Sequence, residues 1–314
     1  MQAPTESDVR RFGLGLAALG RPAYINLGRE GALPADRDVP HMRAATWRVL
    51  DAAYQAGVRW VDAARSYGRA EEFLAGWLAD RGHQDVTVSS KWGYAYVADW
   101  RVDAPVHEVK EHSLDRFRRQ WAETSALLGG RVAVYQVHSL TADSPLFTDR
   151  ALLDALAELA DSGVRLGFST SGPRQAETVR RAIDLEVSGR RLFHSVQSTW
   201  NVLEPSVGPA LAEAHRRGLH VLVKEALANG RLAVQPPPAV EALARRWRCG
   251  PDAVALAAAL AQPWADTVLL GPASVDQLRA NLAAARVTLA EDELSGLAGD
   301  PEDYWAARGA LAWT

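Results

Sequence analysis

Residues 44–64, AATWRVLDAAYQAGVRWVDAA, contain the unit from which the fold is built. Apolar residues recur over Ala44–Ala56 at the three- and four-residue spacing of a helix that buries one face. Gly57 then ends the helix, because glycine adopts the left-handed conformation of a helix C-cap at little cost. The apolar run Arg59–Ala64 follows at once and predicts a strand. The stretch therefore predicts a helix that leads directly into a buried strand.

The same unit recurs along the chain. Gly163 and Gly218 stand just before apolar runs in SGVRL and RGLHV, and helical spacing returns over Phe73–Arg81 and Leu152–Asp161. The predicted strands are Phe12–Gly20, Arg59–Ala64, Val86–Trp92, Val132–Ser139, Arg165–Thr170, His194–Thr199, His220–Glu225 and Thr267–Gly271. Strands and helices that alternate in this number are typical of a closed (β/α)8 barrel. The sequence therefore predicts a TIM barrel in the α/β class, as a single domain over residues 1–314.

A doubly wound sheet is the rival fold for such an alternation. In that fold a GxGxxG motif opens the helix after the first strand. Gly13, Gly15 and Gly20 do not have this spacing, which favours the barrel. We expect the C-terminal residues 286–314 to form a tail that closes over the barrel mouth.

The composition restricts the classes of function. Of the 314 residues, 48% are hydrophobic and 23% are charged, and the net charge is −3. These values exclude a disordered chain and argue against a nucleic-acid or membrane partner. The single cysteine, Cys249, and eight histidines without metal-site spacing predict no metal site. Arg10-Arg11 before FGLGLAALG faintly resembles an export signal, but nearby acidic residues and three glycines favour a cytoplasmic protein.

Polar or ionisable residues close most of the predicted strands. They are Asp62, Lys91, His138, Ser169, Gln197 and Lys224–Glu225. In a (β/α)8 barrel the C-terminal ends of the strands form one face, which carries the active site in enzymes of this fold. Burying polar groups there is unfavourable unless they pair with one another or with a ligand. We therefore expect a functional site at this barrel mouth.

Four residues near this face suit proton donation to a carbonyl oxygen. A free phenol such as that of Tyr67 has a pKa near 10 and is a weak acid. A lysine ammonium beside the phenol lowers that pKa, and a carboxylate keeps the lysine charged and in place. Asp62, Lys91 and Tyr67 would form such a chain. His138 would then hydrogen-bond the substrate oxygen and orient the substrate.

Each of these residues also has a purely structural interpretation. Lys91 and Asp62 alone are compatible with an ion pair that stabilises the barrel. A single histidine such as His138 in an apolar strand is often a satisfied core residue, and Tyr67 before Gly68 is an ordinary turn sequence. Their joint placement at successive strand ends favours the functional interpretation.

Six segments resemble the aldo-keto reductases, in order and in spacing, between Phe12 and Ala285. They are DAARSYGRAEEFLAGWL (62–78), SSKW (89–92), VYQVH (134–138), GFST (167–170), SVQSTWN (195–201) and LLGPASVDQLRANL (269–282). The resemblance implies a (β/α)8 carbonyl reductase that uses NADPH, without metal or flavin, on a small-molecule carbonyl or alcohol substrate. It implies Tyr67 as the general acid, with Lys91 and Asp62 tuning its pKa. His138 would orient the substrate.

The resemblance also implies a cofactor site at the barrel mouth. Ser169, Thr170 and Gln197 would hold the nicotinamide carboxamide, and Lys224 takes the position that usually stacks on the nicotinamide ring. The remaining implied residues are Leu227, Asn229 and Gly230 near the pyrophosphate, and Gly271, Ser274, Gln277 and Asn281 at the adenosine end. Gly271 and Gln277 stand where some family members clamp the 2′-phosphate with Lys and Arg. NADPH nevertheless remains the expected cofactor, on the strength of the family resemblance.

Aromatic side chains are expected to wall the substrate pocket. Trp92, Trp200 and Trp305 are the predicted substrate-binding residues, because aromatic walls suit a flat or hydrophobic substrate or the apolar face of a sugar. Tyr94 lies in the loop after Trp92, and Trp313 lies in the tail. The structural alternative is that these rings pack the loops and the tail onto the barrel.

Three further functions stay open from the sequence. The same groups serve the reverse reaction, so a sugar or alcohol dehydrogenase is an alternative. A cofactor-binding regulatory subunit is another, although the four catalytic positions are all filled. A Schiff-base aldolase, with Lys91 or Lys224 as the nucleophile, would leave the match at the adenosine end unexplained. The natural substrate and the oligomeric state are not predicted.

Overall fold

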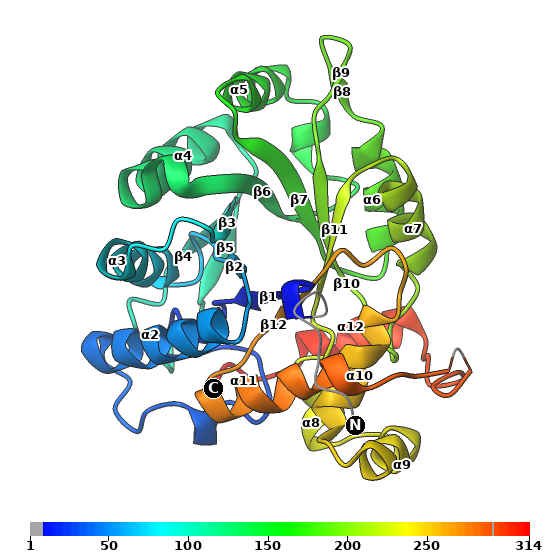
Figure 1. Ribbon diagram of the computed structural model, residues 1–314. Helices are drawn as coiled ribbons and strands as arrows, with labels where there is room; N and C mark the ends of the chain where they lie inside the picture. Colours follow the sequence, from blue (N-terminus) through cyan, green and yellow to red (C-terminus); the bar gives the residue numbers. More distant parts are fainter. Residues whose placement is uncertain (1–8, 291) are drawn as a thin grey trace.

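The computed structural model describes residues 9–290 and 292–314, and within them eight parallel strands close into a barrel (Figure 1). The order around the barrel is β1-β12-β11-β10-β7-β6-β3-β2. The strands are β1 (Phe12–Gly15), β2 (Trp60–Asp62), β3 (Thr87–Trp92), β6 (Val132–Leu140), β7 (Arg165–Thr170), β10 (Ser195–Thr199), β11 (His220–Lys224) and β12 (Thr267–Leu270). Leu14 pairs with Leu270 on one side and with Val61 on the other, which closes the barrel. The predicted (β/α)8 barrel is confirmed.

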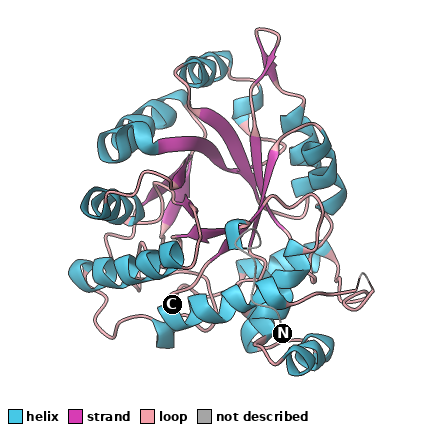
Figure 2. Cartoon of the chain, viewed as in Figure 1, coloured by secondary structure: helices cyan, strands magenta, loops and turns pink. Residues whose placement is uncertain are grey.

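Helices surround the barrel on its outside (Figure 2). They are α2 (Val39–Gln55), α3 (Ala70–Arg81), α4 (Leu114–Leu128), α5 (Arg150–Asp161), α6 (Gln175–Ile183), α7 (Gly208–Arg216), α8 (Arg231–Val234), α9 (Pro238–Trp247), α10 (Pro251–Leu260), α11 (Val275–Leu282) and α12 (Pro301–Gly309). Short 3-10 turns are η1 (Glu30–Ala32), η2 (Gly129–Arg131), η3 (Pro145–Phe147) and η4 (Ala283–Arg286). No helix among the described residues is long and apolar enough to span a membrane.

The predicted helix-ending glycines have the left-handed backbone that their position requires. Gly57, Gly163 and Gly218 have φ values of 102°, 97° and 80°. An L-residue adopts this conformation only at a cost, so glycine ends the helix and turns the chain into the next strand. These three predictions from the sequence are confirmed.

Several element boundaries differ from the prediction, two of them by five residues. The first strand ends at Gly15 instead of Gly20, because Leu16 begins a turn that its carbonyl closes by accepting from the amides of Leu19 and Gly20. The helix predicted from Ala44 begins at Val39, where Asp38 caps it. Two antiparallel hairpins were not predicted: β4 (Tyr94–Tyr96) with β5 (Glu108–Lys110), and β8 (Glu186–Val187) with β9 (Arg190–Arg191).

Residues near the C-terminus contact the loop after β1. The amide of Tyr24 donates to the Thr314 main-chain oxygen at 3.1 Å, and Arg29 Nη1 donates to the same oxygen at 2.8 Å. The Trp313 ring stacks on His107, with 4.2 Å between ring centroids. The final residues are thereby held between the β1 loop and the β4–β5 hairpin.

Candidate active site

A cavity of about 380 Å³ lies where the C-terminal ends of the barrel strands meet. Its lining comes from distant parts of the chain. Residues predicted for the site that line it are Asp62, Tyr67, His138, Gln197, Lys224, Leu227, Asn229, Gly230 and Gly271. Parallel strands in a barrel bring their carboxyl ends to one face, so side chains far apart in sequence converge there.

A buried chain of charged and polar groups joins Asp62, Lys91 and Tyr67. The Lys91 ammonium forms an ion pair with an Asp62 carboxylate oxygen, and both side chains are at most 2% exposed. Lys91 Nζ also donates to the Tyr67 hydroxyl oxygen at 3.3 Å and to the Ala63 carbonyl at 3.0 Å. The three groups therefore lie together in the arrangement predicted for them.

Asp62 is held by further donors as well as by Lys91. Its Oδ1 accepts from Ser89 Oγ at 2.7 Å and from the side-chain amides of Gln136 and Gln197 at 3.1 Å each. A buried carboxylate with several charge-assisted hydrogen bonds is fixed in one orientation. Asp62 is thus a rigid anchor for the ammonium of Lys91.

The phenol of Tyr67 is buried, which raises its pKa well above the usual value of 10; the Asp62 carboxylate adds to this rise. That the ammonium of Lys91 lowers this pKa, relative to a buried phenol without a neighbouring cation, stays a prediction. Burial and the negative charge of Asp62 both act in the same direction, so the net pKa of the phenol lies above 10. Tyr67 therefore carries its proton throughout the neutral pH range.

The imidazole of His138 faces the Tyr67 ring edge to face, with 5.5 Å between centroids. Burial lowers the pKa of His138 well below 6.5, and the positive charges of Lys91 and Lys224 lower it further. His138 is therefore neutral at pH 7 and has one N–H to donate. Its main-chain carbonyl accepts a hydrogen bond from His112 Nε2 at 2.8 Å, which fixes the end of β6.

A second charged cluster lies at the end of β11. Arg308 donates two hydrogen bonds to the Glu225 carboxylate, at 2.5 and 2.9 Å. Lys224 Nζ donates to Thr199 Oγ1 at 2.7 Å and lies 3.6 Å from Glu225 Oε1. Burial lowers the pKa of Lys224 to about 8, and the charge of Arg308 contributes to the decrease. The cluster places a second lysine, in addition to Lys91, at the barrel mouth.

Residues 225–230 turn sharply and contact the loop after β1. Glu225, Ala228, Asn229 and Gly230 all have positive φ. The Leu27 amide donates to the Asn229 carbonyl at 2.9 Å, and Asn229 Nδ2 donates to the Ile25 carbonyl at 3.1 Å. The two loops therefore meet across the cavity.

Gly230 is required by this contact. A Cβ at Gly230 would stand 2.3 Å from the Leu27 carbonyl oxygen, and φ there is 88°. We expect Gly230→Ala to lower the free energy of unfolding by about 1–3 kcal/mol through strain and overpacking. Thermal or urea denaturation measures this. Gly271→Ala is the matched control, because its Cβ would meet no atom within 4 Å; an equal loss in both variants would contradict the account.

Several predicted cofactor residues do not line the cavity. Ser169 Oγ accepts from the Ser139 amide at 2.8 Å, and the Thr170 hydroxyl lies against Ser198 on the outer side of β7. Successive side chains of a strand point to opposite faces, so only one of two neighbours can point inward. Thr170 is thus corrected to an outward-facing residue, by an alternation that the sequence already contained.

Three of the residues implied to bind the adenosine end of the cofactor already form hydrogen bonds within the protein. Gln277 bridges the Ala273 amide and the Gly28 carbonyl. Asn281 donates to Asp252 at 2.7 Å in a buried position, and Ser274 caps α11 while lining a second cavity nearby. Of the four residues implied here, only Gly271 reaches the main cavity.

The three predicted substrate tryptophans point away from the cavity. Trp92 follows Lys91 on β3, so it faces outward and packs edge to face on Phe117 of α4. Trp200 packs edge to face on Trp264. Trp305 donates from its indole N–H to Glu204 at 3.2 Å. The packing alternative is the correct one for these rings.

Other aromatic and charged residues line the cavity instead. Tyr24, Tyr94 and Trp313 supply the rings, and Arg21, Glu108 and Arg308 supply further charges. Arg21 forms an ion pair with Glu108 at 2.7 Å. Tyr94 and Trp313 were visible in the sequence as aromatic residues of the loop and tail. The sequence pattern did not point to four lining residues: Arg21, Tyr24, Glu108 and Arg308. They come from a loop, a hairpin and a helix that lie outside the pattern of barrel strands.

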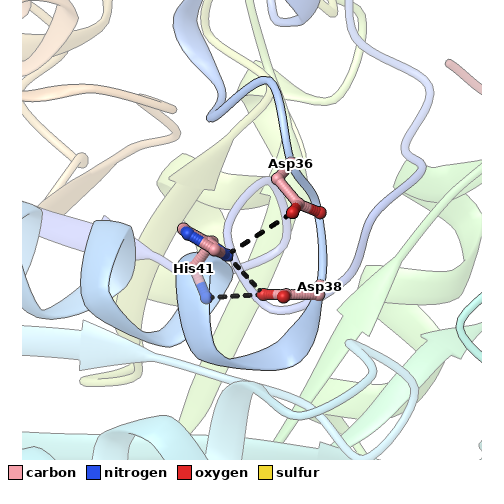
Figure 3. Close-up of side chains that lie close together, drawn as sticks. All are labelled: Asp36, Asp38 and His41. Atoms are coloured by element: carbon pink, nitrogen blue, oxygen red, sulfur yellow. Dashed lines mark hydrogen bonds and ion pairs between the residues drawn. The ribbon is translucent and has the colours of Figure 1, made fainter.

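Asp36, Asp38 and His41 form the group of possible metal ligands found among the described residues (Figure 3). All three are exposed and none lines the cavity. Asp38 accepts from the His41 main-chain amide and from its ring Nδ1, at 2.8 and 2.7 Å, as the N-cap of α2. The cluster is accounted for by helix capping.

Comparison with known proteins places this geometry in a family. The model of the aldo/keto reductase family matches residues 32–299. An aldo-keto reductase of Strobilurus tenacellus is 22% identical over 321 residues, which cover 93% of this chain and 88% of that protein. This match spans nearly the whole of both chains.

Solved structures share the fold. An aldo-keto reductase from Bacillus halodurans superposes with a TM-score of 0.65 at 20% identity, covering 95% of this chain and 91% of that chain. A protein assigned as an aldo-keto reductase from Pseudomonas aeruginosa gives a TM-score of 0.63 at 24% identity, covering 88% and 89%. Since the family model spans most of the sequence, the chain belongs to the aldo/keto reductase family and is an oxidoreductase.

Proposed function

We propose that the protein is an NADPH-dependent carbonyl reductase in which Tyr67 is the general acid. The observation that carries this proposal is the contact of Lys91 Nζ with both Asp62 and the Tyr67 hydroxyl, beside the cavity. Family members generally use a nicotinamide cofactor on small carbonyl compounds. The choice of NADPH and the role of Tyr67 are inferred from the residues of this chain.

A reduced nicotinamide, when bound, supplies the hydride to the carbonyl carbon. Tyr67 donates its proton to the carbonyl oxygen, and the raised pKa of Tyr67 keeps that proton available at neutral pH. As the proton leaves, Lys91 Nζ stabilises the phenolate oxygen from 3.3 Å. Neutral His138 donates its N–H to the same carbonyl oxygen and orients the substrate.

The residues around the cavity fit a dinucleotide. Gln197 lines the cavity beside the catalytic group, where its amide would bind the carboxamide. Asn229 Oδ1 is buried without a hydrogen-bond partner, and Asn229 with Gly230 and Leu227 would border the pyrophosphate. Gly271 would lie beside the adenosine, towards the second cavity at Ser274.

A fluorescence titration with NADPH, combined with an assay for aldehyde-dependent NADPH oxidation, tests the proposal. We expect NADPH to quench tryptophan fluorescence and to be consumed when an aldehyde is added. Binding without consumption under a broad set of aldehydes, ketones and alcohols would favour a regulatory subunit. No binding of either NADPH or NADH would reject the proposed nicotinamide-dependent reduction, and borohydride trapping would then test Lys224 as a Schiff-base nucleophile.

The preference for NADPH has its own test. Arg48 of α2 lines the second cavity, together with Ser274 and Asp276 at the start of α11. Asp276 is paired with Arg279 at 3.4 Å, and this arrangement makes Arg48 the nearby cation for a 2′-phosphate. We expect Arg48→Met to raise the Kd of NADPH about tenfold or more and to leave the Kd of NADH nearly unchanged. Equal effects on both cofactors would contradict this assignment; Arg43→Met, on the same helix but outside that cavity, is the control.

A further inference from the structure

Lys224 stands out because this chain uses lysine so rarely. Among 35 Lys and Arg residues, lysine occurs only at Lys91, Lys110 and Lys224. Two of the three stand at the ends of barrel strands beside the cavity. A lysine ammonium is a compact point charge that titrates more readily than a guanidinium when buried. Position 224 therefore takes the smaller cation in a chain that places arginine nearly everywhere else.

The charges around the cavity do not balance. Three carboxylates line the cavity among the described residues: Asp62, Glu108 and Glu225. Each of them is paired with a different cation. Lys91 pairs with Asp62, Arg21 pairs with Glu108 at 2.7 Å, and Arg308 pairs with Glu225 at 2.5 Å. Lys224 is the fourth cation. It lies 3.6 Å from Glu225, which is already paired more closely with Arg308. One positive charge is left over.

The ammonium of Lys224 also has hydrogen-bonding capacity left. It has three protons to donate, and its contacts are the Thr199 hydroxyl at 2.7 Å and the more distant Glu225. The side chain is 16% exposed and lines the cavity, so a remaining N–H is directed at space that a ligand can enter. Burying a charge with an unused donor is unfavourable unless an anion completes the site.

Lys224 lines the same cavity as Tyr67 and His138. Its charge is one of the main electrostatic causes of the lowered pKa of His138, and the charge of Lys91 in turn lowers the pKa of Lys224. Leu227, Asn229 and Gly230 are the residues proposed to border the cofactor's pyrophosphate, so an anion at Lys224 would belong to the substrate that places its carbonyl between Tyr67 and His138. The aromatic rings of Tyr94 and Trp313 line the same cavity and suit a flat body between the two ends.

We propose that Lys224 binds a carboxylate of the carbonyl substrate, so that the enzyme selects aldehydes or ketones that carry a negative charge. This inference rests on the proposed reductase function and deepens it by naming a substrate class. Lys224 acts here as a specificity-determining residue and takes no part in the proton transfer.

The test compares two benzaldehydes of similar shape, 4-carboxybenzaldehyde, which carries a negative charge, and methyl 4-formylbenzoate, which carries none. The ester group withdraws electrons from the ring more strongly than the carboxylate, so intrinsic reactivity towards hydride favours the ester. A preference of the wild-type enzyme for the acid must therefore come from binding. We expect kcat/KM for the acid to exceed that for the ester at least about tenfold, as for a hydrogen bond to a charged group.

Lys224→Met is the decisive variant, because methionine keeps the length of the side chain and removes the charge. Glu225 keeps its two hydrogen bonds from Arg308, so no buried carboxylate loses its partner and the fold is retained. We expect the acid-to-ester ratio of kcat/KM to fall at least about tenfold, to one or below, because intrinsic reactivity favours the ester. Lys110→Met is the matched control, because Lys110 lies outside the cavity beside Thr141, and its ratio should stay unchanged.

The pH dependence of the ratio provides a second readout. The charged or titratable groups facing Lys224 are Glu225 directly after β11, Arg308 on α12, Lys91 on β3 and His138 on β6. Lys224 is charged below its pKa of about 8 and neutral above it, and a bound carboxylate shifts this value upward. The acid preference should therefore decline as the pH rises above 8. Lys224→Arg should keep its preference over the same range, since arginine does not lose its proton there.

The outcomes separate the two proposals. Reduction of both probes without a preference for the acid overturns the carboxylate site and leaves the reductase function standing. An equal loss for both probes in Lys224→Met also overturns it, because Lys224 would then serve the cofactor or the chemistry. Failure to reduce either probe with NADPH overturns both proposals.

Discussion

Tyr67→Phe should lower kcat at least about 100-fold, the low end of what general acid catalysis contributes, while NADPH still binds. The substitution removes one hydroxyl and keeps the buried ring, so the packing of Tyr67 against His138 and under Arg21 is retained. What is lost is the proton donor next to Lys91 Nζ. Steady-state kinetics with a reducible aldehyde measure kcat, and tryptophan quenching measures cofactor affinity.

His112→Gln is a useful comparison for this experiment. His112 donates to the His138 carbonyl and is not among the residues that line the cavity; its ring nitrogens bond to that carbonyl and to Ser144. A glutamine can still donate to that carbonyl, so we expect a much smaller change in kcat than for Tyr67→Phe. Near-normal kcat in Tyr67→Phe would remove Tyr67 as the acid, whatever the comparison variant does.

Lys91→Met should lower the free energy of unfolding by about 3–5 kcal/mol, as expected when one partner of a buried ion pair is removed. The Asp62 side chain is 2% exposed and would be left without its cation, with only Ser89, Gln136 and Gln197 donating to it. Urea denaturation monitored by tryptophan fluorescence measures the loss. Activity should fall as well, because the phenolate of Tyr67 loses its neighbouring cation.

The double variant Lys91→Met/Asp62→Asn separates charge from packing. Removing both charges leaves no uncompensated buried ion, so at least half of the lost stability should return. Arg150→Met supplies the exposed counterpart, because the Arg150–Asp154 pair lies on the surface of α5 with side chains 67% and 49% exposed. That pair should contribute less than about 1 kcal/mol. A double variant as unstable as Lys91→Met would contradict the account.

The barrel could be predicted because its information is local and repeated. Three helix-to-strand turns are marked by Gly57, Gly163 and Gly218, which adopt a left-handed backbone conformation that other residues avoid. Within the site, Asp62, Lys91 and His138 follow from the same logic, since each stands at or near the end of an apolar strand. The alternation of side chains along a strand also contained the correct orientation of Trp92 and Thr170, which the prediction did not use.

The sequence by itself determined the (β/α)8 architecture and the four residues that meet at the barrel mouth. The spacing of apolar residues and the ends of the strands can both be recognised from residues that are neighbours in the sequence. The tertiary structure alone decided which side chains wall the cavity. Arg21, Tyr24, Glu108, Arg308 and Trp313 come from loops, a hairpin and the last helix, and only folding brings them together. It also decided the protonation of the site: burial keeps the proton on Tyr67, and the pairing of Arg308 with Glu225 leaves the charge of Lys224 uncompensated. The burial of a side chain and the charges around it depend on all of its neighbours in space, so they cannot be predicted from any single stretch of sequence.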